Sequence, residues 1–67
     1  MNIKELVIEY EDVSFLCNST NEFIEFVDLA TSQIDFSKTW FTTTHVETKE
    51  SIKRLYSSRQ IICNNLN

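Results

Sequence analysis

The sequence predicts a small α+β domain of ββαβα order, in which a three-stranded, mostly antiparallel sheet has two helices packed on one face. Two short runs of alternating apolar residues near the N-terminus predict strands, and an amphipathic run after them predicts a helix. A run rich in threonine and aromatic residues, followed by a second helical pattern, completes the order. Because the chain has only 67 residues, we expect one domain over residues 1–63 and a polar tail over residues 64–67.

The first element is predicted to be a β-hairpin. Apolar residues occupy every second position in both runs, which are Leu6, Ile8 and Tyr10, then Val13, Phe15 and Cys17. Glu11 and Asp12 separate the runs and predict the turn, although the Asn-Gly signature of tight hairpins is missing. The chain contains neither glycine nor proline, so its turns depend on Asn, Asp, Ser and Thr. That composition also excludes the glycine-dependent phosphate and dinucleotide loops.

The next element is predicted to be an amphipathic helix from about Thr20 to Ile34. Ser19-Thr20-Asn21-Glu22 is a capping box, in which the side chains of Ser19 and Glu22 satisfy backbone donors at the start of the helix. Phe23, Phe26, Val27, Ala30 and Ile34 share one face, and Glu22, Glu25, Asp28, Ser32 and Asp35 share the opposite face. Leu29 is the exception, because it is an apolar residue on the acidic side.

A strand and a second helix are predicted to follow. From Phe36 to Val46 the period is two, with Trp40 and Phe41 on opposite sides. Apolar area on both sides predicts a central strand, or a strand with one side covered by a partner. From about Glu47 to Cys63 an apolar stripe predicts a helix, and its members are Ile52, Leu55, Tyr56, Ile62 and Cys63. Arg59 interrupts this stripe, so either the helix ends near Ser58 and residues 60–63 form a short strand, or Arg59 meets a carboxylate. Of these we favour a helix that frays or ends between Arg59 and Cys63.

Charge is segregated along the chain. The net charge is −4, yet residues 1–36 carry eight acids and one base, whereas the remainder carries two acids and five bases. One interpretation is internal complementarity between the two halves. A second is an acidic surface, made by the hairpin and the outer helix face, that meets a basic or mixed surface on another protein. A third is nucleic-acid binding by the basic last helix.

The candidate contact residues follow from these interpretations. For a protein partner they are Glu22, Glu25, Asp28, Leu29 and Asp35 from the first helix, Glu11 and Asp12 from the turn, and the aromatic anchors Trp40 and Phe41. For nucleic acid they are Lys49, Lys53, Arg54 and Arg59. We also expect homodimerisation through an open sheet edge or through the Trp40–Phe41 strand, because a second copy would enlarge a small core.

No arrangement of residues indicates catalysis or a cofactor. Cys17, His45 and Cys63 lack the spacing of metal ligands, and we expect neither a metal site nor a catalytic nucleophile among them. The chain shows neither a signal-peptide pattern nor an apolar run long enough for a membrane helix. We therefore expect a cytoplasmic protein whose cysteines are reduced and buried, rather than joined in a Cys17–Cys63 disulfide.

These patterns predict a non-enzymatic protein-binding domain that acts by covering a surface of its target. The lack of Gly and Pro, the single Ala and the many Ile, Asn and Lys residues are typical of AT-rich coding sequences, as in phages. We therefore expect a phage- or mobile-element-encoded modulator or inhibitor of a host protein, located in the bacterial cytoplasm. The alternative is a small nucleic-acid-binding regulator.

Overall fold

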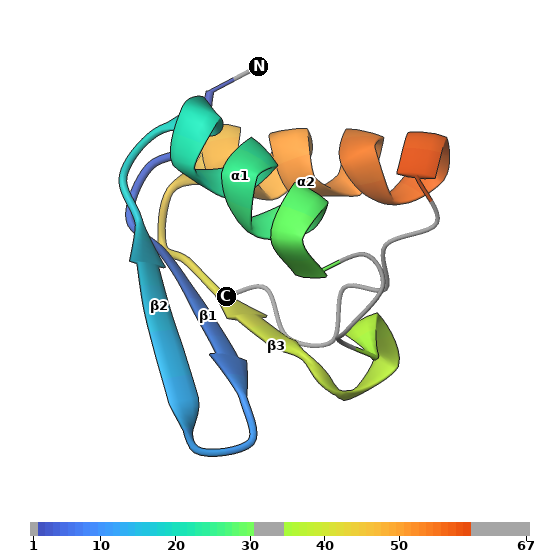
Figure 1. The fold of residues 1–67 in the computed structure, drawn as a ribbon. Helices are drawn as coiled ribbons and strands as arrows, with labels where there is room; N and C mark the ends of the chain where they lie inside the picture. The colour runs from blue at the N-terminus through green and yellow to red at the C-terminus, as the bar shows by residue number, and fades with distance from the viewer. Residues whose placement is uncertain (1, 31–34, 60–67) are drawn as a thin grey trace.

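The computed structural model describes residues 2–30 and 35–59, apart from the side chains of residues 29, 30, 56 and 59. The strands and helices are β1 (Leu6–Tyr10), β2 (Val13–Cys17), α1 (Thr20–Ala30), β3 (Trp40–Thr42) and α2 (Val46–Arg59) (Figure 1). A short 3-10 helix, η1 (Phe36–Lys38), precedes β3. The predicted α+β class and ββαβα order are confirmed.

The strands form one sheet of order β2-β1-β3, and both pairings are antiparallel. Ile8 of β1 lies opposite Phe15 of β2 and opposite Phe41 of β3, so these three residues share the face that the helices cover. Successive residues of a strand point to opposite faces. The other face therefore carries the intervening residues, which are Val7, Glu9, Ser14, Leu16, Trp40 and Thr42.

The hairpin is confirmed, and its turn explains how the chain manages without glycine. Tyr10 and Val13 are paired, so Glu11 and Asp12 alone make the connection. Glu11 has a φ of 52°, in the left-handed region that glycine normally occupies. Glu5, just before β1, has a φ of 48°. For a side chain with a Cβ this conformation costs roughly 1–2 kcal/mol.

α1 begins where the capping box predicts. The Ser19 hydroxyl accepts a hydrogen bond from the Glu22 amide at 3.2 Å, and the Glu22 carboxylate accepts one from the Asn18 amide at 2.9 Å. Phe23, Phe26 and Val27 are buried as their spacing predicts. The predicted end of this helix, at Ile34, lies outside the described residues.

The predicted strand from Phe36 to Val46 is wrong except at β3, which is three residues long and lies at an edge of the sheet. Asp35 caps η1, because its carboxylate accepts hydrogen bonds from the Ser37 amide at 3.0 Å and the Ser37 hydroxyl at 2.6 Å. Such local side-chain bonds compete with a strand ladder. At the other end, the Thr43 hydroxyl accepts from the His45 amide at 3.2 Å, directly before α2 begins.

α2 is bonded to the N-terminal segment by hydroxyl groups, which the apolar stripe did not reveal. Thr48 and Ser51 are buried on the helix face that also carries Ile52 and Leu55. The Thr48 hydroxyl accepts from the Lys4 amide at 2.7 Å and lies 2.9 Å from the Lys4 carbonyl. Further hydroxyl contacts of this segment are Asn2 N to Ser51 Oγ, Ser51 Oγ and Thr48 Oγ1 to Asn2 O, Ile3 N to Thr20 Oγ1 of α1, and Thr43 Oγ1 to Lys4 O. The predicted continuation of α2 to Cys63 lies outside the described residues.

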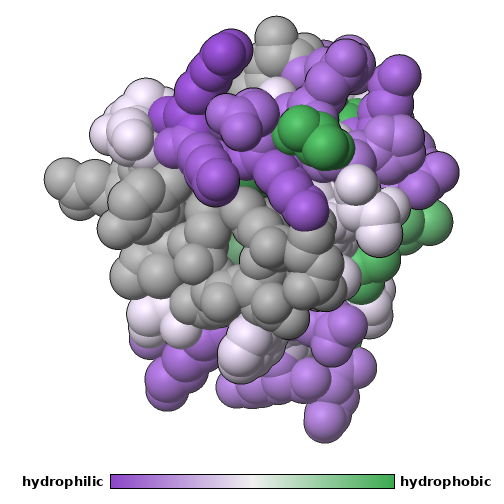
Figure 2. Space-filling model, turned by 180° about the vertical axis from the view of Figure 1, so that it is seen from behind, coloured by the Kyte–Doolittle hydropathy of each residue, from purple (hydrophilic) through white to green (hydrophobic). Residues whose placement is uncertain are grey.

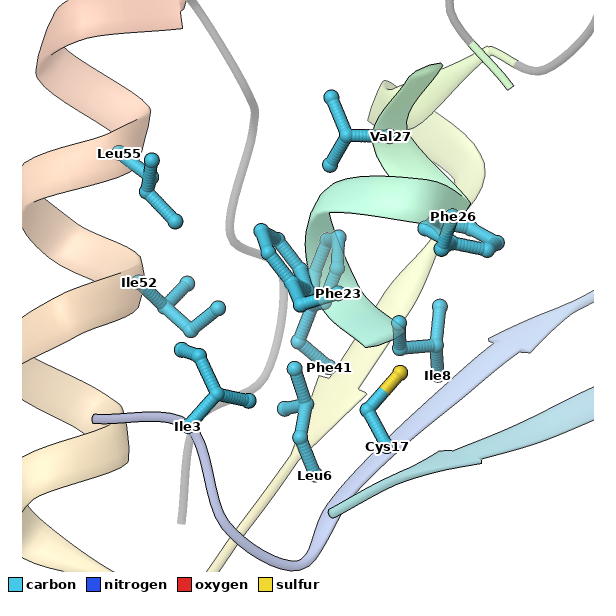
Figure 3. Close-up of a cluster of buried hydrophobic side chains, with 10 residues drawn as sticks. All are labelled: Ile3, Leu6, Ile8, Cys17, Phe23, Phe26, Val27, Phe41, Ile52 and Leu55. Atoms are coloured by element: carbon cyan, nitrogen blue, oxygen red, sulfur yellow. The ribbon is translucent and has the colours of Figure 1, made fainter. Parts of the chain in front are cut away.

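The core lies between the helices and one face of the sheet (Figure 3). Its members come from every strand, both helices and the N-terminal segment: Ile3, Leu6, Ile8, Cys17, Phe23, Phe26, Val27, Phe41, Ile52 and Leu55. Phe36 of η1 packs against this cluster from its margin. The two helices therefore share a single core with the sheet, and the opposite face of the sheet receives no helix of the described chain.

Candidate protein-binding surfaces

The outer side of α1 carries carboxylates on a well-anchored helix. Glu22, Glu25 and Asp28 are exposed, whereas the opposite side of the helix is buried in the core. The Glu22 carboxylate accepts a hydrogen bond from the Asn18 amide in the capping box. Glu25 and Asp28 are therefore the two carboxylates of this helix that are more available to a partner. The side chain of Leu29 lies outside the described part of the chain. The segregation predicted for this helix is confirmed for its described residues.

The other acidic candidates do not join this surface. Glu11 and Asp12 are exposed at the tip of the hairpin, whereas α1 starts beyond the opposite end of β2 (Figure 1). A five-residue strand separates the two sites, which corresponds to about 17 Å. Asp35 has a local role in capping η1, and its hydrogen bonds from Ser37 lower the pKa of its carboxyl group. The acidic surface predicted as one area is therefore divided into separate places.

The two aromatic candidates on β3 lie on opposite faces of the sheet. Trp40 is 51% exposed on the outer face, opposite Glu9. Phe41 is 0% exposed and packs in the core, with its ring centroid 6.4 Å from that of Phe23. The prediction of Phe41 as a partner anchor is wrong, because a partner cannot reach this side chain in the folded chain. Trp40 remains a candidate contact.

β2 exposes apolar side chains that the sequence analysis assigned to a sheet but not to a binding surface. Val13, Phe15 and Leu16 are 49%, 42% and 59% exposed. Leu16 lies opposite Val7 on the outer face. Val13 and Phe15 lie on the inner face, at the β2 edge of the sheet, and are still partly exposed. For Leu16 the signal was present in the sequence, because it falls outside the alternating set of Val13, Phe15 and Cys17 and therefore on the opposite face. From behind, the described surface is mainly hydrophilic and the apolar atoms form small patches (Figure 2).

The basic candidates lie on α2. Lys53 and Arg54 are exposed and Lys49 is half-buried, while the side chain of Arg59 lies outside the described residues. Glu47 and Glu50 share the same helix. α2 therefore carries a mixed surface in which cations are only modestly in excess.

In the part of the chain that the structure describes, ion pairs do not neutralise the separated charges. Between the described side chains, the single contact of a basic with an acidic group joins His45 Nε2 to Glu5 Oε2 at 3.2 Å, and it is an ion pair only when His45 is protonated. The carboxylates of α1 consequently make no ion pair with the described cations of α2. This arrangement disfavours the interpretation in which the acidic and basic halves of the chain complement each other.

Of the candidate ligands and nucleophiles, Cys17 and His45 lie among the described residues. They contain no group of three or more His, Cys, Asp and Glu side chains that could hold a metal ion. Cys17 is buried, and its pKa is raised by burial and by the nearby negative charge of Glu22. A thiol held in its protonated form is a poor nucleophile. Cys63 lies outside the described residues.

Comparisons with protein families, with characterised proteins and with solved structures find no match to this chain. In the part of the chain that the structure describes, neither helix has the length and apolar character needed to cross a membrane.

Proposed function

We propose that the chain is a non-enzymatic protein-binding domain that covers a basic or mixed surface of another protein with the acidic side of α1. The observation that supports this proposal is the state of Glu25 and Asp28, which are exposed on a helix whose other side is buried in the core, and which are unpaired with any described cation. Exposed like charges cost little in water but favour encounter with an opposite charge. A small domain can act in this way by occlusion alone, without a catalytic group.

The buried side of α1 holds this acidic surface in place. Phe23, Phe26 and Val27 fix one side of the helix, and the capping box fixes its start. A rigid surface loses little conformational freedom on binding, which favours affinity. We further propose a host protein in the bacterial cytoplasm as the target of a phage- or mobile-element-encoded chain, on the ground of its AT-rich residue usage.

Charge reversal on the two helices tests the proposal. The tagged chain is used to capture proteins from bacterial lysate, and the captured protein is then purified and its Kd measured by calorimetry. The double variant Glu25→Lys/Asp28→Lys is expected to weaken binding by about tenfold or more, because attraction is replaced by repulsion. Lys53→Glu/Arg54→Glu is the matched control on α2 and should leave binding unchanged. Equal binding by the first variant and the wild type, with both folded by circular dichroism, would contradict the proposal.

A nucleic-acid regulator is the second candidate, supported by the exposure of Lys53 and Arg54. Fluorescence anisotropy with labelled DNA and RNA at low salt tests it directly. Binding that falls steeply with salt and is lost in Lys53→Glu/Arg54→Glu would favour this candidate over the acidic surface. Lack of binding to DNA and RNA at low salt would rule out the nucleic-acid candidate.

A further inference from the structure

β2 presents an unprotected edge. It is the outer strand on one side of the sheet and pairs with β1 alone among the described residues (Figure 1). Natural edges are commonly protected by charge, proline or shortness. β2 (Val13–Cys17) has five residues, with no charge and no proline among them. The opposite edge, β3, is only three residues long.

The register identifies the backbone groups that point outward from this edge. Tyr10 and Val13 flank a two-residue turn, so they form a hydrogen-bonded pair of the antiparallel ladder. Hydrogen-bonded pairs alternate with non-bonded ones, which makes Phe15 a bonded partner of Ile8. The N–H and C=O groups of Ser14 and Leu16 therefore point away from β1. They present two donors and two acceptors along a neutral strand.

We propose that a second copy of this chain pairs with this edge, β2 against β2, in an antiparallel arrangement about a two-fold axis at Phe15. Ser14 of each copy then hydrogen-bonds with Leu16 of the other, so all four outward groups of each strand are satisfied. The two Phe15 rings face each other in a non-bonded pair, where side chains approach most closely. The same strand serves both copies, as an isologous interface requires.

Charge favours a second copy over a charged partner at this edge. β2 offers neither a carboxylate nor a cation to a foreign strand. In the antiparallel arrangement the acidic turns, Glu11 and Asp12, lie at opposite ends of the paired strands. The strands therefore meet through neutral residues, although each chain carries a net charge of −4.

The aromatic packing of the monomer continues into the proposed interface. The ring centroids of Phe15 and of Phe26 in α1 lie 5.3 Å apart, and the centroids of Phe26 and Phe36 lie 6.3 Å apart. A second copy extends this row of three rings to six and covers Val13, Phe15 and Leu16. A small core gains stability from a partner in this way. The paired backbone groups belong to β2 and the acidic side chains belong to α1, so each proposal can fail without the other.

Sedimentation equilibrium over a range of concentrations tests the pairing. The wild type is expected to show a reversible monomer–dimer equilibrium. Ser14→Pro removes an outward N–H that β1 does not use, and Leu16→Lys places a charge at the edge. In a two-fold dimer each change acts twice, so each variant should raise the dimer Kd by about tenfold or more. Ser14→Thr keeps the N–H and Trp40→Lys places the same charge on β3; both controls should dimerise as the wild type does.

Several outcomes would overturn the pairing. These are a wild type that stays monomeric at every concentration, a dimer that survives Leu16→Lys, and a dimer that is lost in Trp40→Lys. A monomeric wild type whose capture of another protein depends on Leu16 would assign the edge to a foreign strand instead. If Ser14→Pro fails to fold by circular dichroism, Leu16→Lys decides alone, because its side chain is exposed in the monomer. Dimerisation that persists in Glu25→Lys/Asp28→Lys separates this result from that of the proposed function.

Discussion

The two faces of the sheet carry similar apolar residue types but place them in different environments. On the inner face Leu6, Ile8 and Phe41 are fully buried under the helices. On the outer face Leu16 and Trp40 keep more than half of their surface exposed. Within residues 2–30 and 35–59 the helices form one layer, and it covers one face of the sheet. Apolar character alone therefore does not show which residues stabilise the fold and which remain available for binding.

The largest expected difference in the free energy of unfolding is between substitutions at two neighbouring residues of β3, Phe41 and Trp40. Phe41→Ala should lower the free energy of unfolding by about 3–5 kcal/mol, because a buried ring is lost from a packed site. Trp40→Ala should change it by less than about 1 kcal/mol, because the indole is half exposed. Urea unfolding followed by circular dichroism measures both, since fluorescence would lose its tryptophan. Similar losses in the two variants would contradict the difference between the faces.

A second prediction tests whether the buried side depends on hydroxyl groups as well as rings. Thr48→Val keeps the shape of this buried side chain but removes the part-buried hydrogen bond from the Lys4 amide. The free energy of unfolding should fall by about 1–3 kcal/mol, because the Lys4 backbone groups lose their hydroxyl partner. Hydrogen exchange at the Lys4 amide should accelerate. Thr44→Val, at an exposed threonine, is the control and should be nearly neutral; equal stability of both variants would show that packing alone holds α2.

A third prediction concerns the exposed hairpin, where backbone conformation rather than packing limits stability. Glu11→Gly should raise the free energy of unfolding by about 1 kcal/mol, because glycine adopts a φ of 52° without strain. Glu9→Gly is the matched control within β1 and should lower it by about 0.5–1 kcal/mol. Thermal unfolding of both variants gives the comparison. Loss of stability in Glu11→Gly would mean that the Glu11 side chain has a role beyond its backbone.

The smallest expected effect is a pH dependence of the free energy of unfolding, which arises from Cys17 on the inner face of the sheet. The pKa of Cys17 is raised above its ordinary value of 9.0, first by burial and then by Glu22. The unfolded chain loses this thiol proton first, so the contribution of the protonated thiol is complete below about 9.0 and is lost as pH rises through the folded pKa. Unfolding free energies measured across this range should therefore fall more steeply with pH for the wild type than for Cys17→Ala. Parallel profiles would indicate that the thiol is accessible to water.

Local patterns predicted the hairpin and α1 well. Both depend on neighbours in sequence, namely the alternation around Glu11–Asp12 and the capping box at Ser19–Glu22. β3 was predicted too long, because the pattern did not show that the Asp35 carboxylate would bond to Ser37 and start a 3-10 turn. Of the candidate contacts, the acids of α1 were predicted on the correct side of their helix. Phe41 was not, because residue type does not distinguish an inner face from an outer one.

The sequence by itself determined the order of the elements, the stripe that α1 buries and the segregation of charge, since each follows from periodicity or composition. Only the tertiary structure decided that β1 is central, that β2 has a neutral edge to which no other described strand pairs, and that threonine and serine hydroxyls join α2 to residues 2–4. These features arise between segments more than 40 positions apart or from the order of strands. Such contacts depend on how the whole chain packs, and a short window of sequence carries no record of them.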